Sequence, residues 1–324
     1  MLAISQYRES FLEYLESTIS LKDPVNLYEP ISYILHLGGK RLRPVLVLMS
    51  AEIFDNSYKK ALNAALAIEV FHNFSLIHDD IMDGAPLRRG KETVHKKWDI
   101  NTGILSGDAM LIYSYQLLEN YDGEVFKELL QLFNKTAMRV CEGQQYDVDF
   151  ESRDDVELVD YLKMIEYKTA VLVAASLKMG AIIAETSTEN KEGVYEFGRL
   201  LGIAFQLQDD YLDAFGDPET FGKQVGGDII ENKKTFLYLS AIQMANAMDA
   251  RQLEYLYSID PVDATGKIEA VKHIFEKSGA SLRAREEIKK YTNKAFEALD
   301  VLEIPVDKKE ILREFGSGLM NREV

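Results

Sequence analysis

The sequence predicts an all-α fold, a single domain of ten or more helices that covers residues 1–324. The chain contains only seven prolines, and none lies between Pro86 and Pro218. Because proline inside a helix removes a backbone hydrogen bond, this long gap favours helices. Apolar residues recur at intervals of three and four in many windows, whereas no convincing period-two alternation and no Asn-Gly hairpin is present.

The expected helices are separated by six breaks that contain glycine, proline or short polar residues: 37–40, 83–92, 121–123, 186–193, 215–228 and 258–261. Two strongly periodic windows, 161–185 and 234–248, lie between these breaks. The most apolar stretch, 170–184, is too short to span a bilayer and contains Lys178, so we expect a buried core helix without stable membrane insertion. None of the breaks resembles an interdomain linker, and one domain is therefore expected.

Acidic residues outnumber basic residues by 53 to 37, which gives a formal net charge of -16. Such a chain is a poor non-specific binder of nucleic acid or anionic membranes, and a polyanionic substrate would need local cations or metal ions. Cys141 is the single cysteine, so no intrachain disulfide can form. A reducing, cytoplasmic location is expected, because the first residues also lack the basic start and long apolar run of a signal peptide.

Three aspartates follow an apolar helical stretch in FSLIHDDIMD, residues 74–83. On a helix, Asp79 and Asp83 share one face, and Asp80 lies about 100° round from Asp79. Like charges at this spacing repel one another, more strongly when they are partly buried, unless a cation is bound. This cluster alone could be a solvated helix end, and His78 beside it could be a metal ligand or only form a nearby hydrogen bond.

The same pattern occurs again in FQLQDDYLD, residues 205–213, where Asp209, Asp210 and Asp213 follow another apolar helical stretch. Chance is a poor explanation for two such clusters in one chain. If the two helices face each other, six carboxylates line one cleft. Oxygen ligands without cysteine or paired histidines suit Mg²⁺, which keeps several waters and takes other ligands from substrate phosphates. The predicted guest is therefore a phosphate or diphosphate that binds as a metal complex.

Basic residues gather in three further segments, as a diphosphate site would require: Lys40, Arg41 and Arg43; Arg88 and Arg89; and Lys223, Lys233 and Lys234. Arginine binds phosphate oxygens with a two-pronged fork, and lysine acts as a point charge. Each segment alone could be a solvated loop. Together they match two anion sites, one that uses metal ions and one that does not.

The chain resembles the trans (head-to-tail) isoprenyl diphosphate synthases, the polyprenyl synthetase family, in an ordered set of segments from about residue 38 to 235. These segments are GGKRLRP, HNFSLIHDDIMDGAPLRRG, LSGD, KT at 168–169, FQLQDDYLD and FGKQVGGDIIENKKT. Each segment alone is modest evidence, whereas the ordered set is specific. The resemblance implies the isoprenoid synthase fold, which is a helical bundle with a central cavity, and it implies a homodimer.

The resemblance also implies roles for individual residues. Direct Mg²⁺ ligands are expected at Asp79, Asp83 and Asp209, supported by Asp80, Asp210 and Asp213, with three ions holding the diphosphate of an allylic substrate. Cations for the same diphosphate are expected at Arg88, Lys168, Lys223 and Lys233, and polar groups beside the developing carbocation at Gln206 and Thr169. A metal-free site for isopentenyl diphosphate is expected at Lys40, Arg43, His72 and Arg89.

The length of the product is expected to depend on the residues just before Asp79. Ser75 and Phe74 lie roughly 6 and 7.5 Å from Asp79 along the helix, and Phe71 about 12 Å. Small Ser75 leaves some room, while the two phenyl rings should stop a long chain. In the family, aromatic residues at this place end elongation early, and some bacterial farnesyl-forming members have an insertion that this chain lacks. Geranylgeranyl diphosphate is the expected product, and farnesyl diphosphate is the alternative.

Other classes of protein share some of these features. A class I terpene cyclase has an all-α fold and one DDxxD, but its second metal motif usually differs and it does not need the metal-free anion site. A metal-dependent phosphohydrolase would need more histidine ligands than His72 and His78 provide. A non-catalytic partner subunit typically loses aspartates from these motifs, and both motifs are whole here. The sequence therefore favours the synthase.

Overall fold

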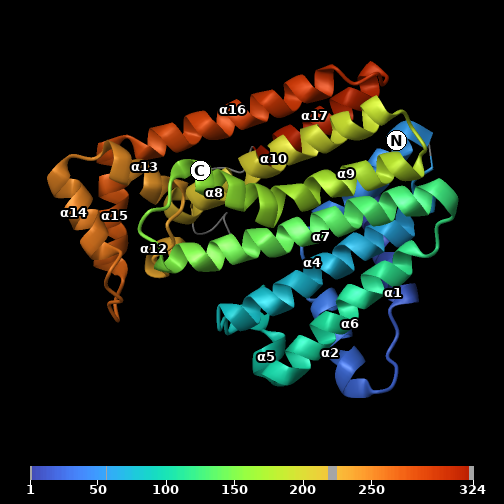
Figure 1. Ribbon diagram of the computed structural model, residues 1–324, viewed down its shortest axis with the longest axis horizontal. Coiled ribbons are helices and arrows are strands. Elements are labelled where there is room, and N and C mark those ends of the chain that lie inside the picture. The colour runs from blue at the N-terminus through green and yellow to red at the C-terminus, as the bar shows by residue number, and fades with distance from the viewer. Residues whose placement is uncertain (1, 56, 218–224, 321–324) are drawn as a thin grey trace. The chain divides into compact units, whose positions relative to one another are not determined.

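A computed structural model describes residues 2–55, 57–217 and 225–320, which are mostly helical (Figure 1). The predicted all-α class and the expected ten or more helices are confirmed. The chain divides into two compact units. The first comprises Met1–Ala137 with Ala175–Tyr195, and the second comprises Met138–Ala174 with Glu196–Val324.

The first unit begins with the elements α1 Ile4–Thr18, α2 Val25–His36, α3 Leu42–Asp55, the 3-10 turn Tyr58–Ala61, α4 Leu62–Met82, β1 Leu87–Arg88, β2 Lys91–Glu92, α5 Val94–Lys97 and α6 Ile100–Leu118. Three helices, α7 Gly123–Ser152, α9 Val171–Ile183 and α10 Thr188–Phe215, have residues in both units. Helices α4 and α6 run side by side (Figure 1). This pairing supports the helix that ends in the first aspartate cluster.

The core of the first unit forms around α3 and α4, which are buried along most of their length. Small residues such as Ala64 and Ala67 are fully buried and let neighbouring helices approach. Gly180 of α9 has the same effect, because a Cβ there would lie 2.4 Å from Val47 O. The predicted burial of 170–184 is confirmed, and Lys178 pairs with Glu192.

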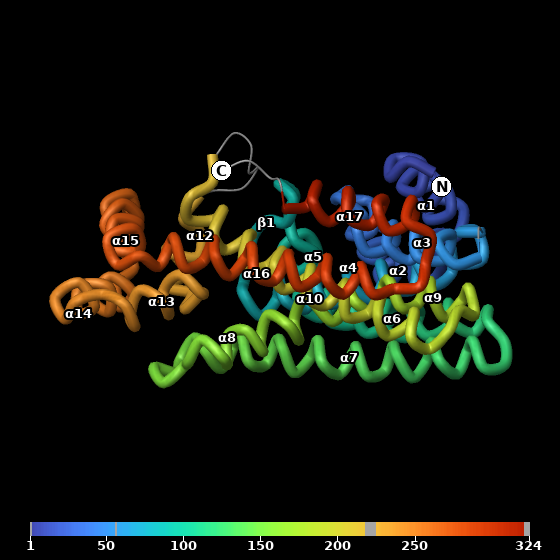
Figure 2. The backbone as a smooth tube through the Cα atoms, turned by 90° about the horizontal axis from the view of Figure 1, so that it is seen from above, coloured from blue at the N-terminus to red at the C-terminus, as the bar shows by residue number. Residues whose placement is uncertain are grey.

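The second unit contains the remaining parts of α7, α9 and α10, with α8 Leu158–Ile165, the π-helical segment Glu166–Ala170, α12 Gly227–Ile230, α13 Phe236–Met244, α14 Ala247–Leu256, α15 Thr265–Ser278, α16 Ala280–Asp300 and α17 Val306–Met320. Figure 2 shows α12 to α15 grouped beside the first turns of α16, and α17 returning along α16. Leu212 of α10, Phe236 of α13 and Phe275 of α15 share one apolar core. This core supports the end of α10, where the second aspartate cluster lies.

Four breaks agree closely with the expected positions, because α2 ends at His36, α4 ends at Met82, α6 ends at Leu118 and α14 ends at Leu256. The break expected at 186–193 is shorter and earlier, since α10 already begins at Thr188. Most of its polar residues therefore form the exposed first turns of that helix. Glu185 makes the turn with a positive φ of 50°. The break at 215–228 follows the end of α10, and residues 218–224 lie outside the described part of the chain.

Two features were not expected. The window 161–185 is not one continuous α-helix, because the π-helical segment Glu166–Ala170 separates α8 from α9. In addition, residues 87–92 form a β-hairpin with strands of two residues each, in which Leu87 pairs with Glu92. Arg89 and Gly90 make its turn with φ values of 54° and 74°. Within the described ranges, no helix is long and apolar enough to cross a membrane.

Candidate active site

The first aspartate cluster occupies the last turn of α4 and the residue that follows it. Asp79 is half-buried, Asp80 is 1% exposed, and Asp83 is exposed at the C-cap, where its N–H donates to Asp79 O at 2.9 Å. A helix C-terminus carries partial negative charge, so carboxylates are unfavourable there. Carboxylates gathered at such a helix end therefore need compensating positive charge.

The β-hairpin brings an arginine to this cluster. Arg88 Nε lies 2.8 Å from both oxygens of Asp80, and Arg88 Nη2 lies 2.6 Å from Oδ1. A two-pronged hydrogen bond of this kind fixes the orientation of the two side chains and also pairs their charges. The hairpin is held to the end of α4 by Ala85 N–H, which donates to Asp80 O at 3.0 Å. Asp80 is therefore bound by protein groups and braces the site.

The expected metal-free site is partly assembled within the first unit. Arg43 Nη1 donates to His72 Nε2 at 3.1 Å, and the Arg89 guanidinium lies against the Gly38–Gly39 turn just before Lys40. Burial lowers the pKa of Arg43 to about 10, and the positive charge of Arg89 adds to this shift. Burial and the nearby arginines, Arg43 first among them, lower the pKa of His72 well below its usual range.

Positive charge therefore gathers here, and the nearby charge of Glu69 opposes it in part. Arg43 Nε is buried and has no hydrogen-bond partner among the described residues. A buried donor without a partner is costly, and an anion in this place would provide one. Arg41 of the same segment also has a buried Nε without a partner among the described residues, but its Nη1 pairs with Glu69 and its Nη2 donates to Leu35 O. Arg41 thus stabilises the turn, which leaves Lys40, Arg43, His72 and Arg89 as the candidate anion ligands.

The second aspartate cluster lies in the last two turns of α10. Asp209 and Asp213 are half-buried, and Asp210 is 6% exposed. Gln206 Nε2 donates to Asp210 Oδ1 at 2.9 Å, and the buried hydroxyl of Tyr161 donates to Oδ2. Burial, with a smaller contribution from the charges of Asp209 and Asp213, raises the pKa of Asp210 to about 7, and the hydrogen bonds from Tyr161 and Gln206 oppose this shift.

The two clusters follow one plan. In each, the middle aspartate is buried and held by protein donors, which are Arg88 for Asp80 and Tyr161 with Gln206 for Asp210. The outer aspartates of each cluster are half-buried or exposed. The middle carboxylates thus fix the helix ends, and the outer carboxylates are the better placed oxygen ligands for Mg²⁺.

Lys168 and Thr169 lie in the π-helical segment, which α7 and α10 contact closely. A Cβ on Gly143 of α7 would lie 2.2 Å from Lys168 N, and a Cβ on Gly202 of α10 would lie 2.7 Å from Ala170 Cα. Because both helices lack a side chain there, the segment fits between them. π-helical turns are frequent at functional sites.

The two site residues expected in this segment each have a hydrogen-bond partner that lies four residues after one of these glycines. Lys168 Nζ lies 2.5 Å from Asp147 Oδ2, and Thr169 Oγ1 donates to Gln206 Oε1 at 3.1 Å. Gln206 in turn donates to Asp210. The second unit therefore connects Thr169, Gln206 and the second aspartate cluster in one hydrogen-bond network.

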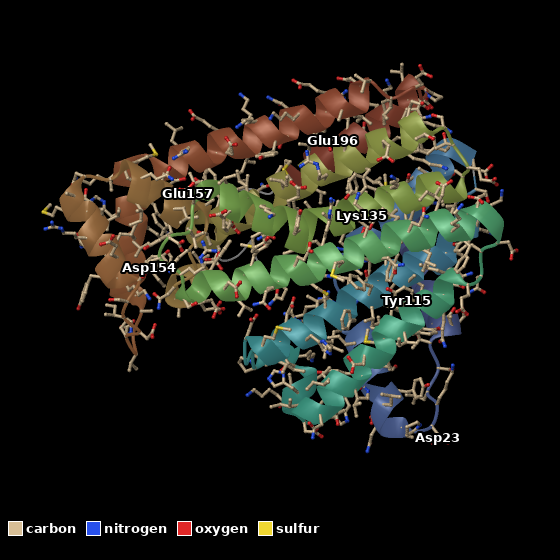
Figure 3. The ribbon with its side chains drawn as sticks, viewed as in Figure 1. Asp23, Tyr115, Lys135, Asp154, Glu157 and Glu196 are labelled. Carbon is tan, nitrogen blue, oxygen red and sulfur yellow. The ribbon has the colours of Figure 1, made fainter. Side chains whose placement is uncertain are left out.

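The segment after α10 carries the remaining expected cations. Lys233 pairs with Glu231 at 2.7 Å, and Lys234 lies 3.0 Å from Asp154, which is labelled at the end of α7 in Figure 3. Asp228 N–H donates to Asp213 Oδ2 at 3.0 Å, and burial raises the pKa of Asp228 well above its usual range. Lys223 lies outside the described residues.

The expected product-length residues lie in a ring cluster of the first unit. Phe71 is 1% exposed and Phe74 is 9% exposed, with ring centroids 5.5 Å apart. Phe133 of α7 packs edge-on against Phe71, and Tyr115 of α6 (Figure 3) packs against Phe133. Ser75 is half-buried, and its hydroxyl donates to His72 O at 2.9 Å.

His78 contacts this cluster as well as α6. Its ring lies edge-on to Phe74 at 4.8 Å between centroids, and its Nε2 lies 3.3 Å from Ile104 O. A Cβ on Gly107 would lie 2.3 Å from that nitrogen, so the imidazole occupies the space that the glycine leaves. Of the two readings open for His78, the structure favours the nearby hydrogen bond.

The donor set suits Mg²⁺, which prefers hard carboxylate oxygens at few protein positions and takes the remainder from water and phosphate. Among the described residues, no group of three or more His, Cys, Asp or Glu side chains is placed to hold a metal ion by itself. Residues that the motifs did not single out also contribute, namely Asp147, Tyr161, Asp228 and the glycines 143 and 202. The sequence signal for Asp147 was the run EGQQYD at 142–147, in which the small Gly143 precedes the acidic Asp147 by four positions.

Comparison with known proteins gives consistent matches. The family model for Polyprenyl synthetase matches residues 24–276. A short chain isoprenyl diphosphate synthase of Methanothermobacter thermautotrophicus is 37% identical over 321 residues, covering 99% of this chain and 98% of that protein. A solved geranylgeranyl pyrophosphate synthase is 53% identical and superposes with a TM-score of 0.96 over 100% of both chains. A geranylgeranyl pyrophosphate synthase from Corynebacterium glutamicum, solved with isoprenyl diphosphate and magnesium, is 26% identical with a TM-score of 0.86, covering 99% of this chain and 98% of that one.

Proposed function

Because the chain belongs to the polyprenyl synthetase family, we propose that it condenses isopentenyl diphosphate head-to-tail with an allylic diphosphate and releases diphosphate. It is a prenyltransferase, and dimethylallyl, geranyl and farnesyl diphosphates are its proposed starters. The observation that carries the proposal is the shared plan of the two aspartate clusters, each with a braced middle carboxylate. A non-catalytic subunit would have no need for both.

We assign the outer aspartates Asp79, Asp83, Asp209 and Asp213 to Mg²⁺, with three ions per active site. The bound ions would neutralise the negative charge that develops on the leaving diphosphate. Lys168, Lys233, Lys223 and Arg88 would add positive charge to the same group. Opposite charges 4 Å apart interact by roughly 4 kcal/mol at an effective dielectric of 20, so a few such contacts lower the barrier substantially.

In this assignment Arg88 has two tasks. Its Nε and Nη2 hold Asp80, and its Nη1 would donate to a phosphate oxygen. Lys168 likewise donates one of the three N–H groups of its ammonium to Asp147. Thr169 and Gln206 would place their oxygens beside the developing allylic cation.

Lys40, Arg43, His72 and Arg89 would hold the diphosphate of isopentenyl diphosphate without metal ions. The buried, unpartnered Arg43 Nε supports this role. We propose one catalytic domain, 1–324, that acts as a homodimer in the cytoplasm. Exposed apolar side chains on α6, Ile104, Leu105 and Ile112, support an interface on that helix.

Geranylgeranyl diphosphate is the proposed product, as in the similar solved synthase. Farnesyl diphosphate is the second candidate, because the Phe74 ring lies only five residues before Asp79 and is backed by Phe71. The aromatic cluster supports a short product in either case. A long polyprenyl chain would need this cluster to open.

The test is incubation of the purified protein with labelled isopentenyl diphosphate, Mg²⁺ and each allylic starter, followed by dephosphorylation and sizing of the products. A C20 or C15 product that is lost on chelation of Mg²⁺ is expected. Asp79→Asn and Asp209→Asn should abolish it while the helical circular dichroism is unchanged. Isopentenyl diphosphate that remains unconsumed with every starter would overturn the proposal. Release of diphosphate without condensation would indicate a cyclase.

A further inference from the structure

Lys267 of α15 is a buried lysine that belongs to none of the motifs described above. Its residue is 4% exposed, and burial lowers its pKa. The ammonium group donates to Asn232 Oδ1 at 2.6 Å, Ile259 O at 2.9 Å and Ile230 O at 3.4 Å. Because an ammonium has three N–H donors, these three acceptors use all of them. A lysine is almost never this buried unless its ammonium group has such partners, so these hydrogen bonds fix the position of Lys267 in the second unit.

Two of the three acceptors of Lys267, Ile230 O and Asn232 Oδ1, lie in the turn that ends α12. Ile230 is the last residue of α12, and Asn232 has a left-handed backbone with a φ of 58°. The Asn232 side chain is held at both ends, since its Nδ2 also donates to Asp260 Oδ1 at 2.8 Å. Lys267 thus fixes a turn that asparagine is one of few residues to adopt readily.

The next residue of α15 supports the beginning of the same segment. Gly226 has a φ of 84°, and a Cβ there would lie 2.9 Å from the Ile268 side chain. Lys267 and Ile268 therefore hold the segment 226–232 at its two ends. We call residues 226–233 the anchored segment.

The anchored segment contacts the second aspartate cluster directly. Gly226 N–H donates to Asp213 O at 2.6 Å, and Asp228 N–H donates to Asp213 Oδ2 at 3.0 Å. Lys233 N–H donates to Asp228 O at 2.9 Å, which closes the turn and places the Lys233 side chain. Any displacement of the anchored segment therefore moves the partners of the Asp213 carboxylate.

We propose that Lys267 is a positioning residue that holds the anchored segment against Asp213 and thereby sets the affinity of the second aspartate cluster for Mg²⁺. The inference rests on the proposed function of Asp213 and Lys233. Lys267 itself touches neither substrate nor metal in this proposal. It acts through backbone and side-chain contacts, as outer groups that orient metal ligands do.

The test is Lys267→Met, which keeps the length of the side chain and removes the ammonium. Hydrogen–deuterium exchange of the amides in 226–233 should become faster, because two hydrogen bonds to that segment, at Ile230 O and Asn232 Oδ1, are lost. The Mg²⁺ concentration that gives half-maximal condensation should rise by roughly 10- to 100-fold, the range seen when groups behind metal ligands are removed. A role in stability alone would leave that concentration unchanged below the melting temperature.

Lys277→Met is the matched control. Lys277 lies on the same helix and pairs with Asp249 at 2.8 Å, but it makes no contact with the anchored segment. It should alter neither the exchange of 226–233 nor the Mg²⁺ requirement. Equal effects of the two substitutions, or an unchanged Mg²⁺ requirement in folded Lys267→Met, would overturn the proposal.

Asn232→Gly is the second variant, since glycine tolerates the left-handed backbone while removing the acceptor for Lys267. It should reproduce the effects of Lys267→Met in part, and the two should not add in the double variant. If Lys267→Met fails to fold, Asn232→Gly with unchanged exchange of 226–233 would itself refute the proposal. The exchange measurement needs no catalysis, so an inactive wild type would sink the proposed function while this inference could still be judged.

Discussion

Arg88 grips Asp80 with a forked hydrogen bond in which Nε lies 2.8 Å from both carboxylate oxygens and Nη2 lies 2.6 Å from Oδ1. The Asp80 side chain is 1% exposed, whereas the Arg88 side chain is 26% exposed. This difference in burial determines which of the two side chains is the more costly to leave without its partner. A buried carboxylate without its partner is destabilising, while the arginine can turn to water.

The first prediction is a double-mutant cycle on this pair. Arg88→Ala should lower the free energy of unfolding by about 3 kcal/mol, because it leaves a buried charge unpaired. In an Asp80→Asn background the same substitution should cost less than about 1 kcal/mol, because no charge is left unpaired. Urea denaturation of the four proteins measures the difference.

The control for this cycle is Lys91→Ala, an exposed residue of the same hairpin. Its effect should be small and equal in both backgrounds. If Arg88→Ala costs the same with and without the Asp80 charge, the pair does not brace α4.

The second prediction concerns product length. Phe74→Ala should shift the product to a longer chain, because the ring lies on the helix just before Asp79 and is not fully buried. Phe71→Ala alone should shift it less, since Phe71 packs behind Phe74 and against Phe133. The double variant should give the longest product on reversed-phase chromatography.

Phe54→Ala provides a matched control, since Phe54 is a half-buried phenylalanine of α3 outside this ring cluster. Its product should keep the wild-type length. An unchanged product in the Phe71/Phe74 double variant would remove these rings as the floor of the pocket.

The sequence allowed the aspartate clusters to be found because their chemistry depends on local spacing. Asp79 and Asp83 share a helix face by geometry alone, and two charged clusters at apolar helix ends are conspicuous. Tyr161 and Lys267 were not found, because they are ordinary residues until the fold brings them to Asp210 and Asn232. Long-range hydrogen bonds leave no periodic signal in a sequence.

The periodicity of apolar residues also failed to predict the local backbone conformation at two places. The π-helical segment 166–170 keeps its apolar residues at near-helical spacing, so the pattern predicts one uninterrupted helix. The signal for the interruption lies elsewhere in the chain, in Gly143 and Gly202, which leave space for it. Similarly, the hairpin turn places Arg89 at a positive φ that arginine rarely adopts, and turn propensities did not suggest it.

The third prediction concerns pH and the Arg43–His72 pair. A guanidinium can only donate, so His72 Nε2 accepts and the imidazole is neutral. Its pKa is well below the ordinary 6.5 in the folded protein, so the unfolded chain binds more protons as the pH falls below that value. His72 therefore contributes stability at neutral pH that is lost on acidification from about 6.5 towards the lower folded pKa.

His72→Gln should remove this contribution, because glutamine keeps an acceptor but does not titrate. The raised pKa values of Asp210 and Asp228 give the wild type an opposing slope, so the comparison must be the difference between variant and wild type at each pH. Urea denaturation from pH 5 to 8 should show a cost of the substitution that shrinks as the pH falls. A cost that is constant with pH would mean that folding does not shift the pKa of His72.

The last prediction tests how the π-helical segment is held. Gly143→Ala would place a Cβ 2.2 Å from Lys168 N and 2.7 Å from its Cα, so the backbone must move. We expect a loss of about 1–3 kcal/mol of unfolding free energy, as for other overpacked sites, and a fall in kcat because Lys168 and Thr169 are displaced. Gly266→Ala is the control, since that helical glycine has open space around it and alanine should be neutral or stabilise by up to about 1 kcal/mol. Thermal unfolding and steady-state kinetics on both proteins separate the two effects. If Gly143→Ala is as active and as stable as Gly266→Ala, close packing against α7 does not determine where Lys168 lies.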